Sequence, residues 1–506
     1  MSNNDLSMRM LVVRWIDYTL MTVLSFFCLA YISHMGKSFA EINVQFPFLN
    51  FPVFVGEFLL MGCVVLFLVR TSFCGIRLNR WWALIILYVC FFMVKAGWGY
   101  NHYGPLAFRH AALFYYFLFA VIAYHCYRPE FFKWWVILIY FGALHWMFFS
   151  GQFYDWWMMP RIFMGLILAY KFPNRLAGML LAASVLVLTP YQYFLQTSRS
   201  IILANFASVS FLILAAGAVI GEKKRSAFLI GSSLLIILFG WYVFYMSGNK
   251  YAQGLVSIDK LKYLYEDTDM IIQQKKDGFK AKEIANVGLY NPETSRSFED
   301  HYEESVLNET VLEEPALTEP QVPSSSFSVV PDQVASPEPP KDSNFDDTIR
   351  EMKIGNSVFR LLIWRDAKKE LIEQRPLFGF DFGKPFRSES LEIVRWGMND
   401  WGRDGWIAMH NSYLETIYRG GIVGIALMTA MVGVFVYCTT VFIRLRSAAG
   451  LLLCATLIIP LVAATFSVSL ELPSPAIPIW TLFGLILAYA HRQLGIHMSM
   501  TGSQRT

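Results

Sequence analysis

Long apolar runs, separated by short polar or basic loops, recur along most of the chain, and many have the roughly 17–25 residues that a helix needs to cross a bilayer. Charged residues make up only 16% of the 506 residues, whereas soluble domains carry about 25%. We therefore predict an all-α membrane protein with about 12 transmembrane helices. The predicted spans lie near residues 11–33, 51–69, 81–98, 110–126, 133–150, 157–172, 176–194, 200–220, 226–247, 414–443, 448–466 and 475–490. The sixth contains Pro160 and Arg161, so it is either a span or a re-entrant segment.

Lys and Arg are concentrated in alternate loops, which indicates the orientation of the helices. Cytoplasmic loops carry an excess of these residues, and the alternation is regular when the N-terminus is placed inside. Both termini are then cytoplasmic. This orientation divides the chain into helices 1–9 over residues 1–247, an outer segment over 248–413, helices 10–12 over 414–491 and a cytoplasmic tail over 492–506. The basic residues of the predicted inner loops include Arg70, Arg77, Arg80, Arg128, Lys133, Lys171, Arg175, Lys223, Lys224, Arg225, Arg444 and Arg446.

The outer segment changes character along its length. Residues 290–347 are rich in Glu, Asp, Pro and Ser and lack hydrophobic periodicity, so we expect them to be disordered. Residues 350–409 are expected to be ordered and partly helical, with an amphipathic helix over 355–373 and a glycine-punctuated turn from Pro376 to Gly383. The apolar positions that predict this helix are Phe359, Leu362, Ile363, Ala367 and Leu371.

Three tryptophans recur every five residues near the end of the outer segment, at Trp396, Trp401 and Trp406. Aromatic faces with polar neighbours can stack on sugar rings. Tryptophan is also enriched at membrane interfaces, so both interpretations stay open.

The remaining composition argues against several classes of site. The seven cysteines show no metal-ligand spacing, so neither disulfides nor a metal site is expected. The net charge of +4 is small and does not indicate a nucleic-acid partner. The lipid bilayer is the one partner that the composition itself predicts.

The stretch around His410 combines a polar run with the start of an apolar helix. Histidine can accept a proton near neutral pH. Gly421 and Gly424 follow one helical turn apart inside the predicted helix. Because glycine costs a helix about 1 kcal/mol relative to alanine, this spacing predicts the close approach of a neighbouring backbone.

Three arginines from distant segments, Arg109, Arg199 and Arg360, are predicted to lie at the same outer face as His410. The guanidinium fork matches the oxygens of phosphate groups. Arginines that converge there would suit a diphosphate. Each could instead be an interface residue that extends its charge to water.

Three motifs occur in order along the chain. They are Gln196-Thr197-Ser198-Arg199, then Asn356-x-x-x-Arg360-x-x-x-Trp364 followed by Pro376-Leu377-Phe378-Gly379-Phe380-x-x-Gly383, and then His410-Asn411 with Gly421-x-x-Gly424. Together they resemble the O-antigen ligase and polysaccharide polymerase superfamily of bacterial membrane glycosyltransferases. The resemblance covers roughly residues 80–490. It departs from the family at Ser200, where glycine is common, and in the long acidic insertion.

The resemblance implies a GT-C-like fold in the bacterial inner membrane, with the outer segment as a periplasmic loop. It implies transfer of a glycan from undecaprenyl diphosphate to an acceptor hydroxyl at the periplasmic face, without a cofactor or metal. His410 is then the expected catalytic residue, as general base or by positioning the hydroxyl. Arg199 and Arg360 are expected to bind the diphosphate, with Arg109 as a third candidate. The expected motif or structural residues are Asn411, Gly421, Gly424, Ser198 and Trp364.

The acceptor defines the alternatives within this enzyme class. Lipid A core would make the chain an O-antigen ligase of lipopolysaccharide biosynthesis, which the His410 motif favours. A second lipid-linked glycan would make it a polymerase of O-antigen, capsule or exopolysaccharide repeats, and a protein side chain would make it an oligosaccharyltransferase. Other glycan-assembly membrane proteins are further candidate partners.

A transporter or a flippase for lipid-linked glycans is the alternative from another class. It predicts ionisable residues near mid-span and internal repeats. Asp17, Glu57 and Lys95 lie near predicted spans, but no repeat is evident. The outer segments also show no evident pair of carboxylates.

Overall fold

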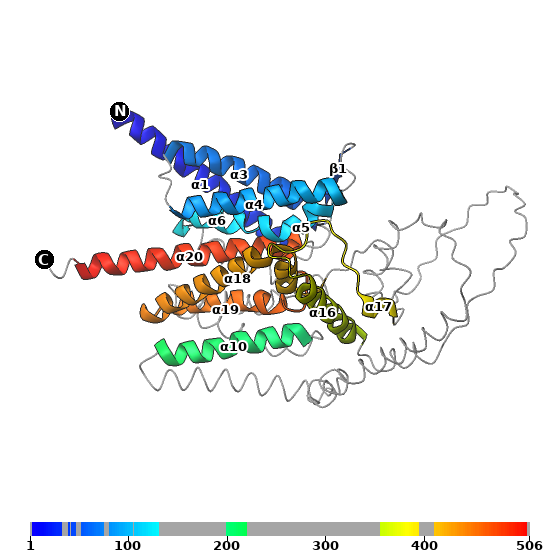
Figure 1. Ribbon diagram of the computed structural model, residues 1–506. Coiled ribbons are helices and arrows are strands. Elements are labelled where there is room, and N and C mark those ends of the chain that lie inside the picture. Colours follow the sequence, from blue (N-terminus) through cyan, green and yellow to red (C-terminus); the bar gives the residue numbers. More distant parts are fainter. Residues whose placement is uncertain are drawn as a thin grey trace, which may run out of the picture. The chain divides into compact units, whose positions relative to one another are not determined.

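The computed structural model describes residues 3–32, 39–40, 42–46, 52–74, 80–104, 106–130, 199–219, 355–393 and 409–502. The chain divides into two compact units. The first comprises Met1–Leu261, Lys369–Lys384 and Ala408–Thr506, and the second comprises Lys262–Lys368 and Pro385–Ile407. Most described residues are helical (Figure 1).

The described elements are helices, apart from one short pair of strands. In the first unit they are α1 (Asn3–Ile32), β1 (Asn43–Gln45), β2 (Pro52–Phe54), α3 (Val55–Cys74), α4 (Arg80–Tyr103), α5 (Leu106–Tyr115), α6 (Leu118–Cys126), α10 (Arg199–Val219), α18 (Ser412–Arg444), α19 (Ala448–Ala463) and α20 (Pro473–Gly502). The second unit contains α17 (Glu389–Ile393) and most of α16 (Gly355–Gln374), whose last residues belong to the first unit.

Six described helices are long and apolar enough to cross a membrane. They are Ser7–Tyr31, Val55–Cys74, Trp82–Tyr103, Leu106–Cys126, Ser412–Arg444 and Pro473–His497. Each coincides with a predicted span, and α10 and α19 are helices where two more were predicted. The prediction of a helical, membrane-type protein is confirmed. The predictions for 133–150, 157–172, 176–194, 226–247, 290–347 and the three tryptophans lie outside the described residues.

Two local features differ from the prediction. The span predicted over 110–126 begins at Leu106 and is interrupted at Tyr116–Phe117, where turns separate α5 from α6. At this interruption, the hydroxyls of the consecutive residues Tyr115 and Tyr116 both donate to Oε1 of Glu57, at 2.9 and 2.6 Å. In addition, β1 and β2 form an antiparallel pair between α1 and α3.

Helix α20 is the central helix of the first unit. It contacts α1, α6, α18 and α19, and it runs between the α1–α6 group and the α18–α19 pair (Figure 1). Gly484 makes this packing possible, because a Cβ there would collide with the main chain of Ala120 on α6. Helix α10 packs on α19, where Ser208 Oγ donates to the Ala455 carbonyl at 2.7 Å.

An ion-pair network joins helices of the first unit near one end. Helix α1 begins and α20 ends at the same end of the helices (Figure 1), as the predicted orientation requires of two cytoplasmic termini. Asp17 of α1, only 1% exposed, pairs with Arg70 of α3 and with Arg128 after α6. Arg70 also donates to the His125 carbonyl at 3.0 Å. Arg70 and Arg128, which belong to two of the predicted inner loops, therefore join α1, α3 and the end of α6.

Replacing Asp17 with asparagine is expected to destabilise the protein. The change leaves two guanidinium groups without their shared carboxylate, and breaking a buried ion pair typically costs about 3–5 kcal/mol. The partial exposure of Arg128, 37%, places the expected loss at the lower end of that range. Thermal unfolding in detergent measures it, with the exposed Glu130→Gln variant as control. Equal melting temperatures for the two variants would contradict the prediction.

In the second unit, the amphipathic helix predicted over 355–373 is confirmed as α16. Its predicted apolar positions Phe359, Leu362, Ile363 and Ala367 are buried. The buried carboxylate of Asp366 accepts hydrogen bonds from Ser388 Oγ and from the amide and hydroxyl of Ser390. These bonds tie the start of α17 to α16.

Candidate functional site

Helix α18, which carries the His410 motif, is broken inside the membrane-type segment. Asn411 is its N-cap, and the Asn411 side chain accepts from the amides of Tyr413 and Leu414 at 3.1 and 3.0 Å. The helix then kinks at Gly421, where φ is 53° and ψ is −132°. Such angles are accessible essentially to glycine alone. The continuous helix predicted over 414–443 is therefore two helical segments that meet at this glycine.

The turn from Pro376 to Gly383 is inserted into the break. In an unbroken helix the amide of Ile422 would bond to the carbonyl of Tyr418. Here the Ile422 amide donates to the Leu377 carbonyl at 2.9 Å, and the Phe380 amide donates to the Tyr418 carbonyl at 2.8 Å. One helical hydrogen bond is thus exchanged for two bonds to the turn. The second and third motifs of the sequence interlock through their main chains.

Lys95 of α4 stabilises the same junction. Its ammonium group donates to the carbonyls of Phe378, Gly379 and Arg419, the last two at 3.2 and 2.7 Å. The carbonyl of Arg419 lies just before the kink at Gly421, and the last carbonyls of a helical segment need partners from outside it. Lys95 therefore supplies donors where the helix cannot. It is 9% exposed, and its charge is held among carbonyl dipoles.

Arg419 anchors the turn from the other side. Its side chain is 2% exposed, pairs with Glu415 at 2.8 Å and donates to the carbonyls of Asp381 and Lys384 at 3.1 and 2.7 Å. The second carboxylate oxygen of Glu415, Oε2, is buried and has no hydrogen-bond partner in the described part of the chain. The Arg419 side chain is thus engaged by groups of the protein itself. Oε2 of Glu415, in contrast, can still accept a hydrogen bond.

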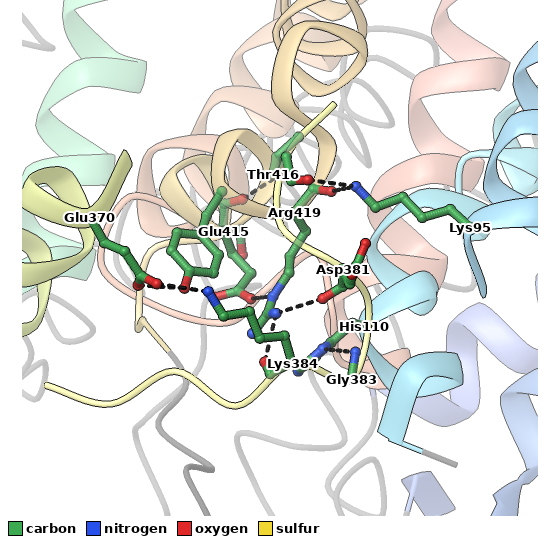
Figure 2. Close-up of polar contacts among 12 residues, drawn as sticks. Lys95, His110, Glu370, Asp381, Gly383, Lys384, Glu415, Thr416 and Arg419 are labelled. Atoms are coloured by element: carbon green, nitrogen blue, oxygen red, sulfur yellow. Dashed lines mark hydrogen bonds and ion pairs between the residues drawn. The ribbon is translucent and has the colours of Figure 1, made fainter. Parts of the chain in front are cut away.

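Two further groups complete the cluster in Figure 2. Nδ1 of His110 on α5 accepts from the amide of Gly383 at 2.9 Å, so the proton of the neutral imidazole is placed on Nε2. Glu370, near the end of α16, accepts from Lys384 at 2.8 Å and from the Tyr418 hydroxyl at 2.7 Å. These contacts bring α4, α5, α16 and α18 to one turn of the chain (Figure 2).

His410 immediately precedes this cluster in the chain and is only partly buried. Its φ is +48°, an unusual angle for a residue with a side chain. The next residues fix its position, because Asn411 caps α18 and the Ser412 amide donates to the carbonyls of Ala464 and Ser467 at 2.9 and 3.2 Å. A partly exposed imidazole is therefore held at the start of the broken helix.

Glu471 is a charged residue of this region that the sequence analysis missed. It lies in the connection between α19 and α20, and the charges that act on it are those of Glu415, Arg109 and Arg419. Burial, reinforced by the negative charge of Glu415, raises the pKa of the Glu471 carboxyl well above its ordinary value. The two carboxylates come from α18 and from the connection after α19, so a comparison of the outer segments alone could not have brought them together.

Of the three arginines predicted to bind the diphosphate, only Arg109 has a described side chain in the first unit. Arg109 of α5 is exposed, and its positive charge influences Glu471 and His110 electrostatically. Arg199 is the first residue of α10, but its side chain, like all of Ser198, lies outside the described part. Arg360 and Trp364 lie on α16 in the second unit, so the structure does not test whether they reach His410.

The predicted glycines are explained by main-chain packing. A Cβ at Gly421 would lie 2.6 Å from the carbonyl carbon of Phe378, and one at Gly424 would collide with the carbonyl of Thr416. The close neighbour of Gly421 is the inserted turn, whereas that of Gly424 is the first segment of its own helix. Both approaches follow from the kink.

The raised pKa of Glu471 predicts how stability depends on pH. A carboxyl whose folded pKa exceeds its unfolded value of 4.5 adds stability below that value, and this stability is lost as the pH rises through the folded pKa. Glu471→Gln, which is always neutral, should therefore unfold at a higher temperature than the wild type at about pH 8 and approach it at about pH 5.

Thermal unfolding in detergent at both pH values checks this. The matched control is Glu373→Gln at an exposed position on α16, which should follow the wild type throughout. A Glu471→Gln variant that is less stable than the wild type at the higher pH would contradict the prediction.

The side chains of this region are suited to proton transfer and to binding an anion. They offer an imidazole at His410, the carboxylates of Glu415 and Glu471, which influence one another electrostatically, and the exposed guanidinium of Arg109. Among the described residues, no three His, Cys, Asp or Glu side chains gather as metal ligands. Neither the protein-family models nor the curated proteins compared with the chain match it.

Proposed function

We propose that this chain is a membrane glycosyltransferase that moves a glycan from a polyprenyl diphosphate, such as undecaprenyl diphosphate, to an acceptor hydroxyl at the outer face of the bacterial inner membrane. His410 acts as general base or positions the acceptor hydroxyl. Arg199 and Arg360, with Arg109, bind the diphosphate and stabilise the charge that builds on it as it leaves. Transfer to lipid A core is the preferred reaction.

The observation that carries the proposal is the interlocking of two motifs that resemble the O-antigen ligase and polymerase superfamily. The turn Pro376–Gly383 and the His410 helix lie in separate parts of the sequence, yet their main chains exchange hydrogen bonds at Gly421. One glycine of each piece accommodates the partner backbone, because a Cβ at Gly379 would collide with main-chain atoms of Arg419 and a Cβ at Gly421 would collide with main-chain atoms of the turn. Two motifs that require each other structurally support a shared role.

The charge distribution of the first unit also supports an outer-face enzyme. The partly exposed His410 lies at the α18 cap, to which the connection that carries Glu471 is bonded, and the exposed Arg109 lies within electrostatic reach of Glu471. The Asp17 network, in contrast, joins the arginines of the predicted inner loops. A reaction on a lipid-linked donor needs its polar groups at one membrane face, where the diphosphate lies.

The transport alternative gains no such support. The three ionisable residues near the predicted spans all have fixed partners within the protein. Asp17 pairs with two arginines, Glu57 accepts from two tyrosines, and Lys95 donates to three carbonyls. Side chains with fixed partners of this kind suit helix packing better than ion coupling.

The proposal is tested by deleting the gene in its host and restoring it on a plasmid. Surface glycans and lipid-linked glycans are then separated on gels. Loss of capped lipopolysaccharide with accumulation of long lipid-linked polymer is expected for a ligase, and accumulation of single lipid-linked repeats would identify a polymerase. Unchanged glycans in the deletion strain would overturn the proposed function.

A further inference from the structure

The connection between α19 and α20 is pinned to the start of α18, next to His410. The hydroxyl of Ser412 donates to the Ser467 carbonyl at 3.0 Å and accepts from the Leu470 amide at 3.1 Å. Glu471 directly follows Leu470. Because Ser412 and Glu415 are one helical turn apart, they lie on the same side of α18, and the Leu470 bond holds the main chain of Glu471 next to Ser412.

The charges around Glu471 are of two kinds. Arg419 and the first oxygen of Glu415 are engaged with one another and with the turn. Glu415 is 5% exposed, and its Oε2 has no hydrogen-bond partner among the described residues. Arg109 approaches from α5 and is exposed. Glu471 thus lies within the electrostatic influence of both Glu415 and Arg109, a setting in which a carboxylate can take up and release a proton.

We propose that Glu471 is the proton acceptor of the transfer reaction, with His410 positioning the acceptor hydroxyl. This inference rests on the proposed function. The hydroxyl oxygen forms a bond to the anomeric carbon of the glycan, and the bond between that carbon and the diphosphate oxygen breaks. The bonding electrons leave with the diphosphate, and the hydroxyl proton passes to the carboxylate of Glu471, which later releases it to solvent.

The chemistry of the site agrees with this role. The negative charge of Glu415 and the burial of the Glu471 carboxyl make it a stronger base than an exposed glutamate, since both raise its pKa. The positive charges of Arg109 and Arg419 act in the opposite direction and lower the pKa of this carboxyl. The side chain is partly accessible, as a group that must meet a substrate requires.

The test uses right-side-out membrane vesicles from cells that express the full chain and supply their own lipid-linked glycan. Transfer per amount of chain in the membrane is measured for the wild type, Glu471→Gln, Glu471→Ala and His410→Ala. Glu373→Gln is the matched control. Glu471→Gln is expected to lower transfer by about 100-fold or more, while Glu373→Gln leaves it unchanged.

Sodium formate separates proton acceptance from a structural role. A small carboxylate can occupy the space left in Glu471→Ala, so added formate should restore part of its transfer, whereas equal sodium chloride should not. His410→Ala should not respond to formate. Rescue confined to Glu471→Ala supports the inference, and absence of rescue overturns it.

The outcomes also separate this inference from the proposed function. Wild-type vesicles that transfer no more glycan than vesicles without the chain would overturn the function itself. Transfer by Glu471→Gln within about twofold of the control, with His410→Ala inactive, would overturn only the role of Glu471. A Glu471→Gln chain that fails to reach the membrane would also count against it, because the neutral side chain should be tolerated there.

Discussion

Replacing His410 with alanine is expected to lower glycan transfer by about 100-fold or more, whether the imidazole accepts the proton or positions the acceptor hydroxyl, while the protein still reaches the membrane. The Asn411 cap and the Ser412 contacts that position residue 410 involve other side chains and main-chain groups, so the start of α18 should persist. Measured on gels of surface and lipid-linked glycans, the loss should match that of the deletion strain.

His410→Asn is the sharper form of this experiment. Residue 410 has a φ of +48°, where alanine costs roughly 1–2 kcal/mol but asparagine is well tolerated. Asparagine therefore keeps the backbone and removes the basic imidazole. It should fold like the wild type and be as inactive as alanine. An active asparagine variant would remove the imidazole from the chemistry.

Periodic features of the sequence were sufficient to predict much of the fold. Apolar runs located six helices of membrane type, and helical spacing placed α16 to within one residue at its C-terminal end. Glycines and proline predicted the turn from Pro376 to Gly383, where Gly379 and Gly383 have φ of 73° and 84°. These features are local, since each depends on residues that are neighbours in the sequence.

The break in α18 was not predictable in the same way. The apolar pattern continues through Gly421, and only the inserted turn explains why the helix divides there. That turn precedes α18 in the chain and contacts it through main-chain hydrogen bonds. Such bonds do not depend on the identity of the side chains, so they cannot be recognised in the sequence. The spacing of Gly421 and Gly424 was interpreted as close packing with a neighbouring backbone, whereas the consecutive pair Gly420-Gly421 is the signal that could have indicated a kink.

Glu415, Arg419 and Glu471 show a second limit. Glu415 and Arg419 have the spacing of a helical ion pair, so their contact could have been predicted. Glu471 follows another helix, and its approach to Glu415 depends on the bonds of Ser412. The predicted membrane face of an arginine cannot distinguish exposed Arg109 from a buried arginine such as Arg419.

Replacing Gly421 with alanine is expected to destabilise the protein by about 4 kcal/mol or more, a size reserved for severe backbone or core damage. Alanine at a φ of 53° and ψ of −132° is strained by about 1–3 kcal/mol. Its Cβ would also collide with main-chain atoms of Leu377, Phe378 and Gly379, which cannot rotate away. The turn must then leave the break, and Lys95 loses two of its three acceptors.

Gly433→Ala is the matched control, because Gly433 lies in the same helix with open space around its Cβ position. Alanine there should be neutral or stabilise by up to about 1 kcal/mol. Thermal unfolding in detergent compares the two, and protease cleavage within 376–384 should increase only for Gly421→Ala. If Gly421→Ala instead unfolded like Gly433→Ala, a continuous helix would be compatible with the fold. The exchange of hydrogen bonds that joins the two motifs would then not be required.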